Sequence, residues 1–117
     1  AGKLVISDRY ADSTFVYQGF VNNFGINKAV KLHKLLLNNF FPKKTFLFTL
    51  APKEINKRLK KRKISNKYDK LDLKFHEKVN LGYKKLSLYN KRFYILDGAK
   101  SLDAIHTEIV DVLNNIK

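Results

Sequence analysis

Apolar residues gather in three short runs, each of which predicts a β-strand. Residues 3–7 form a run that ends at two charged residues, as a buried strand leading to a site would. Residues 45–50 are rich in aromatic and β-branched side chains without polar alternation, which predicts a strand covered on both faces. Residues 92–97 form the third run, and Gly98 is expected to turn the chain after it.

Helical spacing marks the segments that follow the first two runs. In residues 27–40 the apolar positions recur at helical spacing until Pro42 stops the pattern. A second helix is expected from Pro52, because a proline in the first helical turn loses no hydrogen bond. Glu54 supports this start, since a carboxylate there complements the helix dipole. We expect this helix to reach about Arg62.

Two further helices are predicted in the C-terminal half. A polar, aperiodic stretch over residues 63–71 implies a loop before the first of them, which runs to about residue 89. Its expected packing side consists of Leu73, Phe75, Val79, Leu81, Tyr83 and Leu86. Ser101 can cap the final helix. The apolar stripe of that helix consists of Leu102, Ile105, Ile109, Val112, Leu113 and Ile116.

The order of these elements defines the expected fold class. Strand, helix, strand, helix pair, strand, helix is an alternating α/β order, which favours a parallel sheet with right-handed crossovers. The 117 residues are 44% hydrophobic and 13% aromatic, which is enough for the core of one small domain. We therefore expect a single α/β domain over residues 1–117.

Composition excludes several classes of protein. Cysteine is absent, which rules out disulfide frameworks, thiolate metal sites and cysteine nucleophiles. The three histidines do not have the spacing of metal ligands, and none is assigned to catalysis. No apolar run approaches the roughly 20 residues that cross a bilayer. We expect a cytoplasmic protein without a membrane partner.

The formal net charge of +14 suggests an anionic partner, because a positive field concentrates phosphates around a protein. Two explanations stay open. One is a protein that binds nucleotides or nucleic acid, and the other is codon usage in an AT-rich genome, which favours lysine, asparagine and phenylalanine. The 24 basic residues are 20 lysines and four arginines, whereas bidentate binding of phosphates favours arginine. The overall charge therefore does not decide between them.

Polar residues follow two of the three predicted strands. In an open parallel sheet, ligands bind beyond the carboxyl ends of the strands. Asp8 and Arg9 follow the first run, Ala51 and Pro52 follow the second, and residues 97–101 (Asp-Gly-Ala-Lys-Ser) follow the third. The first and third of these ends are therefore candidates for binding a phosphorylated ligand.

The extended run at residues 8–19, Asp-Arg-Tyr-Ala-Asp-Ser-Thr-Phe-Val-Tyr-Gln-Gly, carries a more specific signal. It resembles the central signature of thymidylate kinases, a family of P-loop nucleoside monophosphate kinases. The resemblance covers nearly the whole chain, because it continues through residues 52–54, 58–63, 66–69, 75–79, 82–83 and 92–101. It implies a P-loop-kinase-like parallel sheet with flanking helices.

The resemblance implies catalytic roles for Asp8 and Arg9. Arg9 would contact the phosphate of dTMP, where a guanidinium can hold two oxygens and fix the direction of the acceptor. Asp8 would lie beside the phosphates and help to organise Mg²⁺ or its waters, since this cation prefers carboxylate oxygen. Structural alternatives stay open. Arg9 could pair with Asp8 or another carboxylate, and Asp8 could be the N-cap of the next segment.

Further residues match positions that bind the acceptor nucleotide in the family. Ser13 and Thr14 match positions that face the thymine base, where hydroxyls can satisfy its polar edge. Tyr17 matches the aromatic position that packs against the deoxyribose, although packing in the core is an alternative for it. Gln18 is a candidate for the same pocket, and Tyr83 could reach the acceptor from the helix after the loop.

Basic residues surround the predicted loop at about residues 62–71. The resemblance implies that this loop is the lid that closes over ATP, placing cations on the transferring phosphoryl group and excluding water. Arg62 and Lys67 would contact phosphates, with Arg58 near the adenine. The turn that contains Lys100 would border the adenine ring. A plain solvated face is the alternative, and Lys67 stands where the family often has arginine, which puts bidentate binding there in doubt.

One part that the family requires is absent from the sequence. A glycine-rich P-loop ending in Gly-Lys-Ser/Thr binds the donor phosphates in such kinases, and none of the 117 residues forms one. We therefore expect a fragment whose sheet lacks the central P-loop strand, which leaves a gap between the first strand and the other two. We also expect this chain alone to transfer phosphoryl groups poorly or not at all.

The resemblance implies ATP and dTMP as co-substrates, dTDP as product, Mg²⁺ as cofactor and a homodimer in the intact enzyme. Two rivals stay open. A deoxynucleoside kinase shares the fold and an acid-arginine pair, but its acceptor lacks the 5′-phosphate. A small basic module that binds RNA or DNA is the other, supported by the charge and the tyrosines. Because the cations gather in a helix-loop-helix segment, we expect no nucleic-acid partner.

Overall fold

The computed structural model describes residues 2–61, 68–88 and 90–116, with Leu59 and residues 68–73 described by their backbone alone. Helices and strands alternate along these ranges. They are α1 (Ala11–Thr14), η1 (Phe15–Val21), α2 (Ile26–Leu37), β1 (Thr45–Thr49), α3 (Pro52–Lys61), α4 (Tyr68–Leu88), β2 (Phe93–Asp97) and α5 (Leu102–Asn114). None of the helices within the described part of the chain is long and apolar enough to cross a bilayer.

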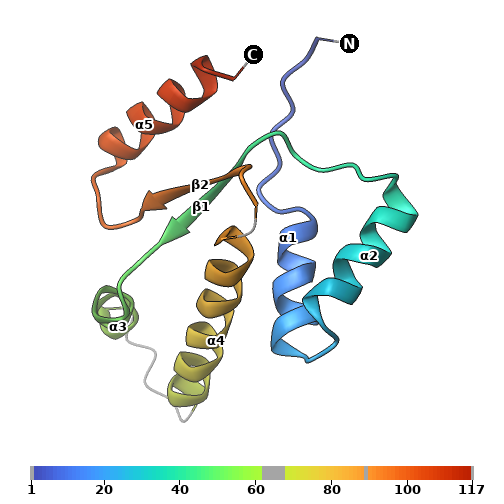
Figure 1. The fold of residues 1–117 in the computed structure, drawn as a ribbon. Coiled ribbons are helices and arrows are strands. Elements are labelled where there is room, and N and C mark those ends of the chain that lie inside the picture. Colours follow the sequence, from blue (N-terminus) through green and yellow to red (C-terminus); the bar gives the residue numbers. More distant parts are fainter. Residues whose placement is uncertain (1, 62–67, 89, 117) are drawn as a thin grey trace.

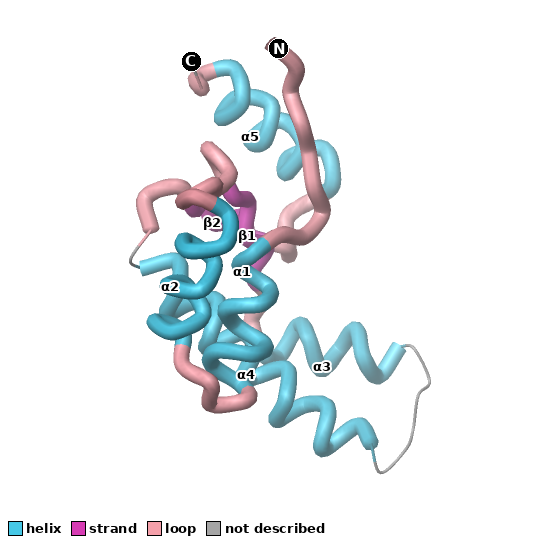
Figure 2. Tube along the Cα trace, turned by 90° about the vertical axis from the view of Figure 1, so that its right-hand side faces the viewer, coloured by secondary structure: helices cyan, strands magenta, loops and turns pink. Residues whose placement is uncertain are grey.

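Strands β1 and β2 form a parallel pair, in register from Thr45 opposite Phe93 to Thr49 opposite Asp97. The connection between them runs through α3 and α4, as parallel strands require. Helix α5 lies on one side of the pair, and α1, α2 and α4 lie on the other (Figures 1 and 2). The predicted α/β class with a parallel sheet and flanking helices is confirmed.

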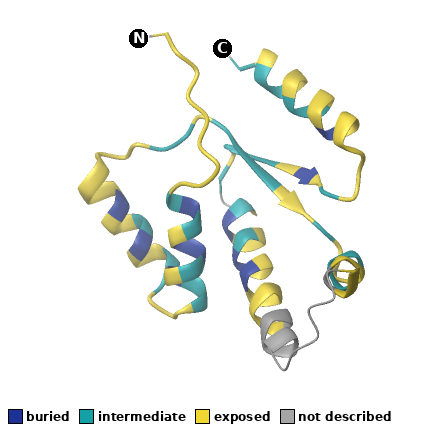
Figure 3. Ribbon diagram, turned by 180° about the vertical axis from the view of Figure 1, so that it is seen from behind, coloured by how far each residue is buried: buried dark blue, intermediate teal, exposed yellow. Residues whose placement is uncertain are grey.

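Residues 3–7 do not form the predicted first strand. They belong to an extended N-terminal segment in which Leu4, Val5 and Ile6 are 73%, 85% and 80% exposed (Figure 3). A strand needs a neighbouring backbone to bond its N–H and C=O groups, and the only pairing within the described ranges joins β1 to β2. The apolar run is therefore present in the sequence, but it has no partner strand.

The helical segment from Ala11 to Val21 was not predicted, and its second part is a π-helix. Phe15 and Val16 are 2% and 0% exposed and form the core with residues of α2 and α4, which are Ala29, Val79 and Leu86. Aromatic and β-branched residues have low helix propensity, so this helix depends on tertiary packing more than on its own sequence.

Gly82 permits the close approach of η1 and α4. A Cβ at this position would lie 2.9 Å from Val16 Cγ1 and 2.9 Å from Phe20 Cδ1. Only a residue without a side chain fits at that distance without displacing one of the two neighbours. The packing of α4 against η1 at this point therefore depends on a residue without a side chain.

Several predicted boundaries move by a few residues. Helix α2 ends at Leu37, earlier than residue 40, because Asn38 and Asn39 adopt the left-handed conformation with φ of 50° and 62°. Helix α3 begins at Pro52, as predicted, and ends at Lys61. Helix α4 begins at Tyr68, so residues 68–71 are helical and not part of the predicted loop.

Three expectations about burial are wrong. Strand β1 is not covered on both faces, since Phe48 is 58% exposed. On α4, Phe75 and Leu81 are 41% and 47% exposed. Phe75 shares the side of Val79 and Leu86 but is only partly covered, with its ring 5.9 Å from that of Tyr17, whereas Leu81 lies off that side. Leu102 of α5 is 85% exposed. The stripe of α5 reaches the interior only from Ile105 onward, where the helix lies against the sheet.

Helix α5 has the predicted cap, since Ser101 Oγ accepts a hydrogen bond of 3.2 Å from the backbone N–H of Ala104.

A buried ion pair, also unexpected, ties α1 to the amino ends of both strands. Arg92 donates from Nη1 and Nη2 to the two carboxylate oxygens of Asp12, over 2.7 and 2.5 Å. Nη1 also lies 2.7 Å from Thr45 Oγ1, at the start of β1. The guanidinium lies over the rings of Phe93 and Phe41, with centroids 4.7 and 5.3 Å away. The pair therefore holds the first turn of α1 against the amino ends of β1 and β2.

Candidate functional site

Four of the predicted acceptor residues gather in one place, which we call the acceptor cluster (Arg9, Ser13, Tyr17 and Tyr83). The hydroxyls of Ser13 and Tyr83 lie 2.9 Å apart and share a hydrogen bond across 70 positions of sequence. The Arg9 guanidinium lies 6.0 Å from the centre of the Tyr17 ring. Ser13 and Tyr17 are four residues apart on adjoining helical turns, so two hydroxyls, an aromatic ring and a cation lie near one another.

Packed helices hold this cluster in place. Ser13 lies in α1, Tyr17 lies in the π-helix η1, and Tyr83 lies in α4 next to Gly82. The rings of Tyr17 and Tyr83 are half-buried against the core, so the core-packing alternative for Tyr17 holds at the same time. The ring of Phe75 also lies 5.9 Å from that of Tyr17. These side chains therefore combine support from the core with partial exposure to solvent.

Two further candidates point elsewhere. Thr14 is exposed. Gln18 accepts a hydrogen bond of 3.0 Å from Asn22 Nδ2 on the exposed surface of the same helix. Neither forms a side-chain hydrogen bond with the acceptor cluster in the described part of the chain.

Asp8 is exposed, and neither structural alternative for it is observed. Asp8 and Arg9 form no ion pair with each other or with another described residue. The N-cap residue of α1 is Tyr10, and it makes no side-chain capping bond. A carboxylate that serves neither purpose remains accessible to a cation or to its water shell.

A second group of residues surrounds the turn after β2, and it includes the predicted site residues Arg58 and Lys100. We call it the turn cluster (Glu54, Arg58, Gly98, Lys100 and Glu108). Arg58 donates from Nε to Glu54 Oε1 over 3.1 Å and from Nη2 to the backbone oxygen of Gly98 over 3.2 Å. Lys100 Nζ lies 3.6 Å from Glu108 Oε2. The structure thus brings Arg58 and Lys100, both predicted to border ATP, to one turn.

The turn itself is well braced. The backbone N–H of Gly98 donates to Thr49 O over 2.8 Å, and that of Ala99 donates to the Asp97 carboxylate over 2.9 Å. Tyr94 donates from its hydroxyl to Glu108 Oε1 over 2.9 Å. This hydrogen bond to a carboxylate raises the pKa of Tyr94 above 10.0, and the negative charges of Glu108 and Asp111 raise it further.

The turn cluster and the first turn of α1 are attached to opposite ends of the strand pair. The turn cluster lies at the carboxyl ends of β1 and β2, where the sequence predicts a ligand site. The helix that carries Ser13 is anchored at the amino ends, through Arg92 and Thr45. The expectation that Asp8 and Arg9 reach the carboxyl edge of the sheet is wrong, because residues 3–7 do not pair with it.

Arg62 and Lys67 lie outside the described residues, as does most of the predicted lid over 62–71.

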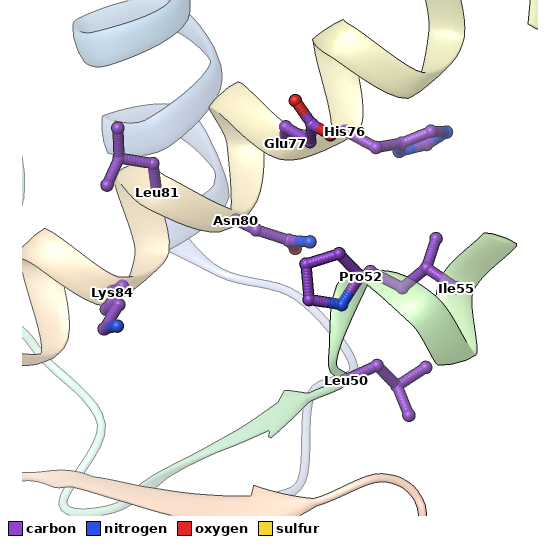
Figure 4. A pocket seen from close by; sticks show the side chains of 8 residues that line it. All are labelled: Leu50, Pro52, Ile55, His76, Glu77, Asn80, Leu81 and Lys84. Carbon is purple, nitrogen blue, oxygen red and sulfur yellow. The ribbon is translucent and has the colours of Figure 1, made fainter.

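A cleft of about 360 Å³ opens between the end of β1, the start of α3 and the outer face of α4 (Figure 4). Its apolar wall consists of Leu50, Pro52 and Ile55, and its other lining residues are His76, Glu77, Asn80, Leu81 and Lys84 of α4. Sequence reasoning missed this cleft, and none of the predicted site residues that the structure describes lines it. The available signal was the four-residue spacing of His76, Asn80 and Lys84, which places them on one helical face.

The described side chains offer few direct ligands for a metal ion. No group of three or more histidine, aspartate or glutamate side chains that could hold an ion occurs in the ranges that the structure describes. Mg²⁺ needs fewer protein ligands than this, because it keeps several waters and takes further oxygens from bound phosphates. The exposed Asp8 carboxylate fits such water-mediated binding.

Parallel strands, flanking helices and cations at the carboxyl ends of the strands place the chain among α/β proteins with features of a nucleotide site. Comparison with known proteins is more specific, because the family model "Thymidylate kinase" matches residues 1–109. The chain belongs to the thymidylate kinase family.

Individual relatives agree with this assignment. The chain is 35% identical over 113 residues to a "Thymidylate kinase" of Thermoanaerobacter sp. (strain X514), covering 96% of this chain and 55% of the relative. It is 36% identical over 113 residues to that of Acholeplasma laidlawii (strain PG-8A), covering 93% and 55%. For Geobacillus sp. (strain WCH70) the identity is 35% over 108 residues, covering 90% and 51%. The chain therefore spans about half the length of these relatives.

Proposed function

We propose that this chain supplies the dTMP-binding site and part of the ATP-binding site of a cytoplasmic enzyme that phosphorylates dTMP to dTDP with ATP and Mg²⁺. Family membership supports the proposal, and the observation that carries it is the hydrogen bond between Ser13 and Tyr83 beside Arg9 and Tyr17. This arrangement offers hydroxyls for a base, an aromatic face for a sugar and a guanidinium for a phosphate.

Each acceptor residue has a distinct proposed role. Arg9 binds the phosphate of dTMP and fixes its direction, which converts binding energy into orientation of the attacking oxygen. The hydroxyls of Ser13 and Tyr83 bind the polar edge of thymine, and Tyr17 packs on the deoxyribose. Thr14 and Gln18 would join them only after a change of side-chain conformation.

On the donor side, Arg58 and Lys100 border the base of ATP, while Arg62 and Lys67 bind its phosphates. Asp8 holds Mg²⁺ through water, and the ion would supply charge neutralisation on the transferring group. No P-loop occurs in the 117 residues, so we propose that this chain alone does not turn over. A coupled assay with ATP, Mg²⁺ and dTMP should remain at background, and ordinary turnover would contradict this part.

Binding of dTMP to the full chain tests the acceptor role. We expect dTMP to shift the amide resonances of residues 9–17 in an NMR titration. Replacing Ser13 by Ala should weaken binding by roughly two- to tenfold, the value of one lost hydrogen bond. Ser87→Ala is the matched control, because the Ser87 hydroxyl donates to the Lys84 carbonyl on the exposed surface. Absence of any dTMP-dependent shift would refute the acceptor role.

Thymidine distinguishes the nearest enzymatic rival. The acceptor of a deoxynucleoside kinase has no 5′-phosphate, so Arg9 would add nothing to acceptor binding in such an enzyme. In that case thymidine should bind at least as tightly as dTMP. Strong, salt-dependent binding to polynucleotide without any effect of dTMP or ATP would favour the nucleic-acid module instead.

We also propose a homodimer formed through α2. Four leucines of this helix and one phenylalanine shortly after it are open to solvent: Leu32, Leu35, Leu36, Leu37 and Phe40 are 49%, 77%, 68%, 48% and 66% exposed. A patch of this kind is typical of an interface between subunits. Sedimentation should show a dimer that Leu35→Glu dissociates, with Lys34→Glu on the polar face as control.

A further inference from the structure

Each cation of the turn cluster has a carboxylate of its own. Glu54 contacts Arg58 at 3.1 Å from four positions earlier on α3, and Glu108 on α5 contacts Lys100 at 3.6 Å. Both cations are half-exposed, with side-chain exposures of 50% and 51%. Neither pair is buried enough to act mainly as a stabiliser of the fold, because exposed ion pairs contribute little.

The contacts of Arg58 restrict the plane of its guanidinium. Glu54 holds Nε from one side and the Gly98 carbonyl holds Nη2 from another. Two bonds to separate partners fix the orientation of a planar group, whereas one bond would leave it free to rotate. Its remaining nitrogen and its flat face stay available for a ligand at the turn.

The charge of α3 makes this restraint necessary. Within Pro52–Lys61 there are five cations (Lys53, Lys57, Arg58, Lys60 and Lys61) and one acid, Glu54. Like charges repel, so without Glu54 the neighbouring lysines would drive the Arg58 head group away from the helix. Glu54 is therefore placed where a carboxylate has the largest effect on the direction of Arg58.

Lys100 is held in a comparable way. Glu108 receives the hydroxyl hydrogen of Tyr94 on one oxygen and faces Lys100 with the other. Tyr94 belongs to β2, so its hydrogen bond orients the Glu108 carboxylate relative to the sheet. The oriented carboxylate in turn positions the Lys100 ammonium group. The backbone N–H of Lys100 bonds the Asp97 carbonyl over 3.2 Å, which fixes the start of its side chain.

We propose that Glu54 and Glu108 are positioning residues for nucleotide binding, each aligning one cation, Arg58 or Lys100, at the turn after β2. The inference rests on the proposed function for its ligand, ATP. It predicts that anion affinity falls when an acidic residue is removed. Removing an acid from a protein of net charge +14 should strengthen anion binding if only overall attraction mattered, whereas loss of alignment should weaken it.

The experiment measures ATP affinity of the full chain by NMR titration, following the amide resonances of residues 97–101. We expect Glu54→Gln and Glu108→Gln each to weaken ATP binding about two- to fivefold, the scale of an exposed ion pair. Asp103→Asn is the matched control, since Asp103 lies near the same turn and contacts neither cation in the described ranges. Its binding should be unchanged or tighter.

A second measurement separates this inference from the proposed function. The Arg58 Nε–H resonance should be visible and protected from exchange in the wild type and lose that protection in Glu54→Ala, which removes the acceptor oxygen, with or without ATP. If the wild type fails to bind ATP, the donor role fails while this signal still decides the positioning claim. Unchanged protection in Glu54→Ala, or ATP binding by Glu54→Gln as tight as that of Asp103→Asn, would overturn the inference.

Discussion

Two arginine–carboxylate pairs lie at opposite ends of the same strand pair, and they differ in almost every physical respect. At the amino ends, Arg92 and Asp12 form two hydrogen bonds with side chains 13% and 10% exposed. At the carboxyl ends, Arg58 and Glu54 share one bond with side chains 50% and 34% exposed. The first pair lies within a packed end of the molecule and the second within an open end.

The difference shows that burial determines whether an arginine–carboxylate pair holds the fold together or stays available to a ligand. Charges removed from water must be fully paired, so Arg92 uses its donors on Asp12 and Thr45 and has aromatic rings beside it. Such an arginine cannot serve a ligand without large cost. Arg58 remains half-exposed to solvent and its ion pair is weak, so it can bind a ligand at little cost.

The largest effect is expected from breaking the buried pair. Asp12→Asn leaves the Arg92 charge buried without a counter-charge, which should lower the free energy of unfolding by about 3–5 kcal/mol. Urea denaturation measures it. The double variant Asp12→Leu, Arg92→Met should recover much of the loss, because neither charge is then buried. A loss below about 1 kcal/mol in the single variant would show that the packed end does not depend on this pair.

Gly82→Ala tests the helix contact within the same packed end. A methyl group there meets Val16 and Phe20 at 2.9 Å, so overpacking should cost about 1–3 kcal/mol. Alanine is otherwise the better helix former, which makes the expected sign informative. Asn80→Ala, at an exposed position of α4, is the control and should not destabilise. A more stable Gly82→Ala variant would contradict the close approach.

At the open end, the cap of α5 should matter moderately. Ser101→Ala removes the acceptor for the Ala104 N–H and should cost about 1 kcal/mol in thermal or urea unfolding. Ser101→Asp should restore most of it, since aspartate is also a good N-cap. Equal stability of the alanine variant and the wild type would mean that the cap is dispensable.

Glu54→Gln should barely change stability, by less than about 1 kcal/mol, because its ion pair with Arg58 is exposed. The comparison with Asp12→Asn is the sharpest version of the contrast between the two ends. One variant should lose stability, and the other should lose nucleotide affinity at nearly constant stability. Similar destabilisation by both would erase the distinction.

The smallest effect concerns pH. The hydrogen bond to Glu108 raises the pKa of Tyr94 in the folded protein, so its contribution to stability is present below pH 10.0 and is lost as the pH rises through the higher folded value. Ultraviolet titration should show one tyrosine ionising later than an ordinary tyrosine. Tyr94→Phe should abolish this late step, and Glu108→Gln should move it toward the ordinary range.

Several elements were predictable because their causes are local. Strands β1 and β2, the start of α3 at Pro52 and the cap at Ser101 follow from propensity, proline geometry and a side-chain bond within three residues. The motif at residues 8–19 also identifies the family without knowledge of the structure. Local rules and the family signature thus suffice for the class of fold.

The tertiary structure decided that residues 3–7 remain unpaired, that residues 15–21 form a π-helix, and that Ser13 meets Tyr83. It also decided which arginine is buried and which stays open. Strand pairing and burial depend on partners distant in the chain, so propensity and spacing along the sequence carry no information about them.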